Sequence, residues 1–163
     1  IGTLTHINMN DQTLLSPTLS RARMFLRYIA CVGLLNLFWE VLQLPLYTLW
    51  DEGPPTAIAF AVVHCTLGDI LIATASLFAA LVLLGGKNWP QERYWRVALL
   101  ASAVGASYTV FSEWNNTVVT RTWAYSSLMP TLWGIGLSPV LQWVLIPVLV
   151  FWRLSHQNSE DRT

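Results

Sequence analysis

Four long apolar stretches dominate this chain of 163 residues and limit what it can fold into. They run from about 24 to 49, 56 to 84, 97 to 113 and 132 to 152. Crossing a bilayer takes about 20 predominantly apolar residues in a helix, and the shortest stretch is close to the lower limit. Only 11% of the residues are charged and 54% are hydrophobic, which is too little charge to cover a soluble domain. We therefore predict an all-α integral membrane protein, a bundle of four transmembrane helices.

The basic residues give these helices a direction. With four spans, the termini and the 85–93 loop lie on one side of the membrane, and the 51–55 and 115–130 loops lie on the other. Of the nine Lys and Arg residues, all but Arg121 fall on the first side. Because cytoplasmic loops carry an excess of Lys and Arg, we predict that both termini are cytoplasmic.

The expected organisation is a single membrane domain with two polar ends. Residues 1–23 form a polar cytoplasmic segment, 24–152 the four-helix transmembrane domain, and 153–163 a cytoplasmic tail. Met9 is a candidate natural start, which would make 1–8 an upstream extension. The formal net charge is zero, so nothing in the composition favours nucleic acid as a partner.

The third stretch is rich in small residues. They recur four apart, a pattern that lets helices approach closely in lipid, as in the pairs Ala98 and Ser102, Ala101 and Gly105, and Ser102 and Ala106. We therefore expect this helix to be the most buried of the four.

Polar residues inside the apolar stretches are the candidate functional residues, because charge within a membrane is costly and usually faces the bundle interior. In the first stretch they form one helical stripe of Asn36, Glu40, Gln43 and Tyr47. A second stripe, in the third stretch, comprises Ser102, Thr109, Glu113 and Asn116. The other two stretches carry His64, Thr66 and Asp69, and Ser138 and Gln142.

The depths of these residues predict one site in the outer half of the membrane. At 1.5 Å per residue, six of them reach a similar level: Glu40, Gln43, His64, Glu113, Asn116 and Gln142. Asp69 is expected below them, and the 115–130 loop above, with Trp123 and Tyr125 as a lid. The catalytic candidates are Glu40, His64 and Glu113. The ligand-binding candidates are Gln43, Asp69, Asn116, Trp123, Tyr125 and Gln142.

Carboxylates and an imidazole in a site of low polarity are suited to proton transfer. The same side chains bind zinc, iron or manganese. However, the sequence has no H-x-x-x-H, E-x-x-H or H-E-x-x-H spacing, so no metal or other cofactor is assigned. The structural alternative is that these polar groups only hydrogen-bond one helix to another.

Several stretches of the sequence resemble two groups of membrane proteins. "EVLQLPLY" at 40–47, "VVHCTLGDILI" at 62–72 and "QWVLIPVLVFWRL" at 142–154 are similar to helices of the emopamil-binding sterol isomerase and sigma-2 receptor superfamily. That resemblance implies an intramembrane acid/base pocket for a sterol-like ligand and carries over only to Glu40 and His64. The "WE…Q.PLY", "H…GD" and "SEW.N…WAY…MP" signatures resemble small bacterial four-helix inner-membrane proteins of uncharacterised function, which implies no activity.

The leading hypothesis is a polar, outward-facing intramembrane pocket that binds or isomerises a small amphiphilic molecule. The first alternative is a protein that handles protons or metal ions, with Asp69 as a relay in the middle of the membrane. The second is a non-catalytic accessory subunit of a larger membrane complex, or a homo-oligomer. In every case the lipid bilayer is the surrounding partner.

Overall fold

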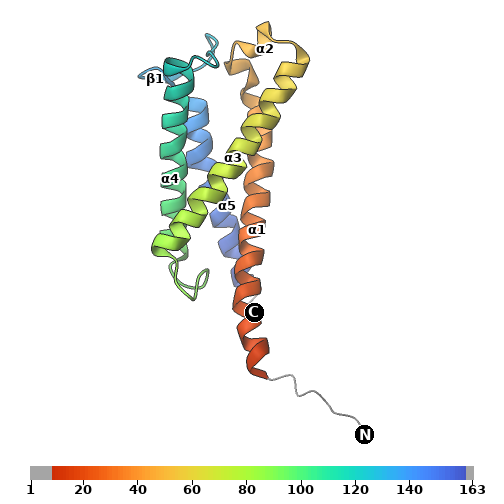
Figure 1. Ribbon diagram of the computed structural model, residues 1–163, viewed down its shortest axis with the longest axis vertical. Helices are drawn as coiled ribbons and strands as arrows, with labels where there is room; N and C mark the ends of the chain where they lie inside the picture. The colour runs from red at the N-terminus through yellow and green to blue at the C-terminus, as the bar shows by residue number, and fades with distance from the viewer. Residues whose placement is uncertain (1–8, 161–163) are drawn as a thin grey trace.

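A computed structural model describes residues 9–160 and shows a bundle of long helices (Figure 1). Its four long helices are α1 (Met9–Gln43), α3 (Pro55–Leu84), α4 (Tyr94–Trp114) and α5 (Leu137–Glu160). The short elements are the 3-10 helix η1 (Leu44–Leu46), α2 (Leu49–Glu52), the π-helical turn η2 (Asn115–Val119), and the hairpin of β1 (Thr131–Leu132) and β2 (Ile135–Gly136). The prediction of an all-α fold is confirmed.

Three of the long helices could cross a membrane. Their apolar segments are Arg21–Leu46, Pro55–Leu84 and Leu137–Gln157, each long enough to span the hydrocarbon core. Many large apolar side chains on these helices are exposed, such as Leu71 and Phe78, as expected where lipid covers the surface. These features suggest a multi-pass membrane protein.

Several element boundaries differ from those predicted. The backbone of α1 is helical from Met9, well before the predicted start at 24, and α5 continues past 152 to Glu160. The hairpin replaces the start of the fourth predicted span. The proposed upstream extension at 1–8 and the end of the tail at 161–163 lie outside the described residues.

The long helices form a ring of contacts in which α1 and α4 each pack against both α3 and α5. Half of the α5 membrane segment is buried, against 22% and 28% for the segments of α1 and α3. In α4, six of 21 residues are buried. The expectation that the third span is the most buried is therefore wrong, since α5 buries more of its length.

The small residues of α4 nevertheless serve close packing. Ala98, Ala101 and Gly105 are buried. A Cβ at Gly105 would lie 2.2 Å from the Trp143 ring, so only glycine leaves room for that indole. This contact joins α4 to α5.

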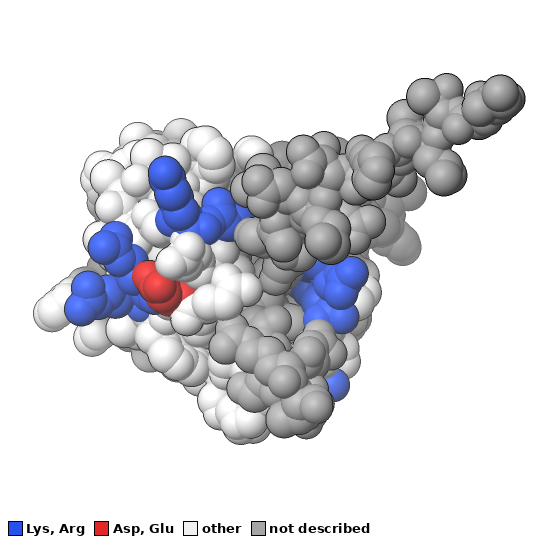
Figure 2. Space-filling model, turned by 90° about the horizontal axis from the view of Figure 1, so that it is seen from below, with Lys and Arg blue, Asp and Glu red and all other residues white. Residues whose placement is uncertain are grey.

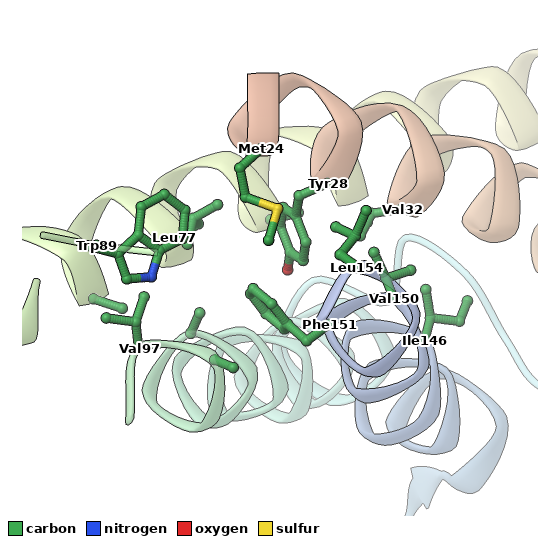
Figure 3. Close-up of a cluster of buried hydrophobic side chains, with 14 of the residues drawn as sticks. Met24, Tyr28, Val32, Leu77, Trp89, Val97, Ile146, Val150, Phe151 and Leu154 are labelled. Carbon is green, nitrogen blue, oxygen red and sulfur yellow. The ribbon is translucent and has the colours of Figure 1, made fainter. Parts of the chain in front are cut away.

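One half of the bundle is filled by an apolar cluster (Figure 3). Tyr28 and Phe151 stack with their ring centroids 4.5 Å apart, and the Tyr94 hydroxyl donates to the Phe151 carbonyl at 2.6 Å. Around them lie buried side chains from α1, α3, α4, α5 and the 85–93 loop, among them Met24, Val32, Leu77, Trp89, Val97 and Leu154.

The 115–130 loop is attached to the end of α1. Its first residues continue the helix as η2. Tyr125 then forms an antiparallel bridge with Tyr47, flanked by hydrogen bonds from Thr48 N to Ala124 O and from Ser126 N to Leu46 O. The loop thus closes over the polar end of the bundle.

Candidate functional site

Gln142 lies at the centre of a buried hydrogen-bond network that we call the polar network. This side chain of α5 is 1% exposed. Its amide nitrogen Nε2 lies 2.6 Å from Asn36 Oδ1, 3.2 Å from Glu40 Oε1 and 3.0 Å from Asp69 Oδ2. One amide of α5 therefore joins side chains from α1 and α3.

The arrangement brings two acids together. An amide nitrogen carries two hydrogens, fewer than the three oxygens around Gln142 Nε2. Glu40 Oε1 and Asp69 Oδ2 both lie within 3.2 Å of this one nitrogen, so the two carboxyl groups are close neighbours. Two ionised carboxylates this close repel each other, and a proton on one of them relieves the repulsion.

Asp69 is held by a second donor. Its Oδ1 accepts a hydrogen bond from Trp143 Nε1 at 3.1 Å. Because Trp143 lies against Gly105, the packing of α4 on α5 sets the position of the indole that orients this carboxyl group.

Glu40 continues the network towards the end of α1. Its Oε1 accepts from Gln43 Nε2 at 2.9 Å, and Gln43 Oε1 accepts from the Ser138 hydroxyl at 2.8 Å. The Ser138 hydroxyl in turn accepts from Trp39 Nε1 at 3.1 Å. This chain of donors fixes the orientation of the Gln43 amide and of the Glu40 carboxyl group.

Glu113 forms a second polar group at the end of α4. The Tyr125 hydroxyl donates to Glu113 Oε2 at 2.5 Å and accepts from Gly136 N at 2.9 Å. Burial, followed by the hydrogen bond to Glu113, raises the pKa of Tyr125 above its usual value. The phenol therefore stays protonated and keeps its role as the donor to Glu113.

Tyr47 joins the end of α1 to the loop that carries Tyr125. Its ring centroid is 5.6 Å from that of Tyr125. Burial raises the pKa of Tyr47, and the charges of Glu113 and Glu40 raise it further. Both acids are thus close enough to act on the same phenol.

Three buried polar atoms near this region have no hydrogen-bond partner within residues 9–160. They are Thr66 Oγ1, Thr109 Oγ1 and Trp123 Nε1. Thr66 is one helical turn from Asp69, and Thr109 is one turn from Glu113. Buried polar groups normally pair, so this region has unused capacity for a polar group or water.

Most of the candidate residues converge, but two do not. Glu40, Gln43, Asp69 and Gln142 share the polar network, so Asp69 lies close to Glu40. His64 is exposed and its ring stacks 5.5 Å from that of Phe60, outside the network. Asn116 donates only within its own helical segment, to the Ser112 carbonyl and hydroxyl.

Sequence reasoning missed the two indoles of the site. Trp39 and Trp143 each adjoin a residue assigned to the site, Glu40 and Gln142 respectively. Tryptophan in membrane proteins commonly anchors the chain at the interface, so these two indoles were not expected to be hydrogen-bond donors. One signal in the sequence could have identified these indoles. The acids in the apolar stretches have few basic residues nearby in the sequence, so their hydrogen-bond donors must be neutral groups such as an indole.

No cluster of three or more His, Cys, Asp or Glu side chains suited to a metal ion occurs in the described part of the chain. Comparison with known proteins adds no relative: no family model, no curated protein and no solved structure matches the chain.

Proposed function

We propose that this chain is an integral membrane protein in which the Glu40 and Asp69 pair takes up and releases protons inside the bundle. One observation carries the proposal: the two carboxyl groups lie together in the bundle, where both contact the amide nitrogen of Gln142, at 3.2 and 3.0 Å. The proposal includes a fourth membrane crossing by α4 and a bacterial inner membrane with both termini in the cytoplasm.

The alternative of a purely structural role explains the amides better than the acids. Asn36, Gln43 and Gln142 alone would link α1 to α5, and such contacts contribute about 0.6 kcal/mol each in membrane proteins. Two carboxyl groups add desolvation and mutual repulsion to that network. Their donors named above are amides and an indole, which are neutral. The charge of the site therefore depends on how many protons the pair holds.

Tyr47, Glu113 and Tyr125 suggest where the protons enter. Tyr47 lies near both Glu40 and Glu113, and Tyr125 joins Glu113 to the loop that closes this end of the bundle. In the proposal, Glu113 exchanges protons with the external side, and the Glu40 and Asp69 pair holds them.

Infrared difference spectroscopy of the purified protein tests the pair directly. We expect a carboxylic-acid band at neutral pH that titrates as the pH is raised, and that disappears in both Asp69→Asn and Glu40→Gln. The matched controls are Asp51→Asn and Glu52→Gln, which remove exposed acids of α2 near the same end of the bundle. They should leave the band unchanged.

Proton flux into vesicles containing the protein supplies the functional readout. Flux should fall to background in Asp69→Asn and persist in Asp51→Asn. If the carboxylic-acid band is absent from the wild type, or survives both substitutions in the pair, the proposal fails.

The unpartnered groups favour a second candidate function. Thr66, Thr109 and Trp123 could receive the polar group of a small amphiphilic ligand, with Glu113 as the acid or base. The resemblance to the emopamil-binding superfamily also implies an amphiphilic, sterol-like ligand, although His64 is exposed and lies outside the polar network. A ligand of this kind should stabilise the wild type against heat but not Glu113→Gln, with Glu52→Gln as the control.

A further inference from the structure

A groove lies at the opposite end of the bundle from the polar network. It has a volume of about 720 Å³ and lies between residues 21–26 of α1 and the end of α3 with its following loop. Two of the residues that line it are basic, Arg21 and Lys87. Its apolar lining includes Ala22, Phe25, Leu26 and Leu81.

The groove lies at the depth where lipid headgroups are expected. Leu84 is the last residue of the α3 apolar segment, and Lys87 lies three residues beyond it. The Arg21 side chain donates to carbonyl groups of the same loop, so both basic side chains lie at the end of that segment, whereas Leu81 lies within it.

Arg21 is fixed at the rim of the groove. Its Nε donates to Trp89 O at 2.9 Å and its Nη2 donates to Gly86 O at 3.3 Å. A guanidinium has five N–H donors, so these two bonds leave others for an anion. Lys87 is exposed in the same loop.

The surface around the groove is strongly basic. Viewed from this end, Lys and Arg side chains form several groups on the part of the surface drawn in colour, with one acidic patch beside them (Figure 2). Arg23, Arg27, Arg93, Arg96 and Arg153 are exposed and belong to this end of the chain's helices.

We propose that this groove binds one anionic phospholipid, with its phosphate between Arg21 and Lys87 and an acyl chain along Phe25, Leu26 and Leu81. A basic rim joined to an apolar lining at the interface matches the two parts of such a molecule, and each interfacial basic residue attracts anionic lipid. The inference does not depend on the proton-handling proposal.

Native mass spectrometry of the delipidated full chain tests the groove with dioleoylphosphatidylglycerol. We expect retention of one molecule in preference to dioleoylphosphatidylcholine. Lys87→Gln and Arg21→Gln should each weaken the binding about fivefold, the factor expected from one interfacial charge. Ala22→Trp should abolish it without any change in charge, because the indole would fill the groove.

Arg96→Gln and Arg153→Gln are the matched controls, since each removes one exposed charge near the same end but outside the groove. Both should keep wild-type binding. Arg21→Gln also removes two bonds to the 85–93 loop, so Lys87→Gln and Ala22→Trp decide the result if that variant does not fold.

The proposal would be overturned by any of three results. Lipid binding could fall as much in the two controls as in the groove variants, the protein could retain both lipids equally, or Ala22→Trp could bind the lipid as the wild type does. Inorganic phosphate that displaces the lipid completely at equal concentration would also overturn it, because the site would then recognise a free anion.

Discussion

The two halves of this bundle are built from the same helices but are held together by different interactions. In α1, Tyr28 and Val32 belong to the apolar cluster, and Asn36 and Glu40, one and two turns further on, belong to the polar network. The apolar cluster is held by ring stacking and close packing of side chains. The polar network is held by directed hydrogen bonds around Gln142.

This difference indicates where stability and function lie. Lipid tails are as apolar as the cluster, so in a bilayer the cluster would stabilise the bundle through the density of its contacts and not through escape from water. The polar network contributes less to the free energy of unfolding, because part of its hydrogen-bond energy offsets the desolvation of two acids. Substitutions in the cluster should therefore cost stability, whereas those in the network should alter the site.

The largest effect is expected for Phe151→Ala. The substitution removes the ring that stacks on Tyr28 and leaves a cavity, which should reduce the free energy of unfolding by about 3 kcal/mol or more. Phe78→Ala is the control, because that ring is 64% exposed on the outer face of α3. Unfolding followed in detergent measures both. A loss in Phe78→Ala as large as that in Phe151→Ala would contradict the assignment of stability to the cluster.

An intermediate effect is expected for Gly105→Ala, which links the two halves. The new methyl group would overlap the Trp143 ring and displace the donor to Asp69, at a cost of about 1 to 3 kcal/mol. Gly68→Ala, on α3 beside Asp69, meets nothing within 4 Å and should be neutral or stabilising by up to about 1 kcal/mol. Calorimetry compares the two. The close approach at Gly105 is refuted if both variants behave alike.

The smallest effect is expected for Tyr125→Phe, which removes the bonds to Glu113 and Gly136 and should cost about 1 to 2 kcal/mol at neutral pH. Because the folded-state pKa of Tyr125 is raised above the usual 10.0, the unfolded chain ionises first as the pH rises. The stabilisation by this phenol is therefore complete below pH 10 and lost above it. Wild type and variant should converge in alkaline unfolding experiments.

Tyr108→Phe, at an exposed position of α4, is the matched control for Tyr125→Phe. It should follow the wild type at every pH. A constant gap between wild type and Tyr125→Phe from neutral to strongly alkaline pH would show that the phenol does not hold its proton as described.

The sequence by itself determined the features that depend on neighbours along one helix. Helical periodicity placed Asn36, Glu40 and Gln43 on one face, and all three join the polar network. The same local rule identified α3 almost to the residue, because Pro55 and Gly85 bound a long, predominantly apolar run.

Only the tertiary structure decided which faces meet. His64 and Asp69 are five residues apart, or about 140° around a helix, so one rotation of α3 cannot turn both inwards. Packing of α3 against α1 and α4 turns Asp69 towards Gln142 and leaves His64 exposed. The pairing of Glu40 with Asp69 depends in the same way on Gln142, 73 residues beyond Asp69. No local pattern encodes that contact, because the packing of whole helices sets it.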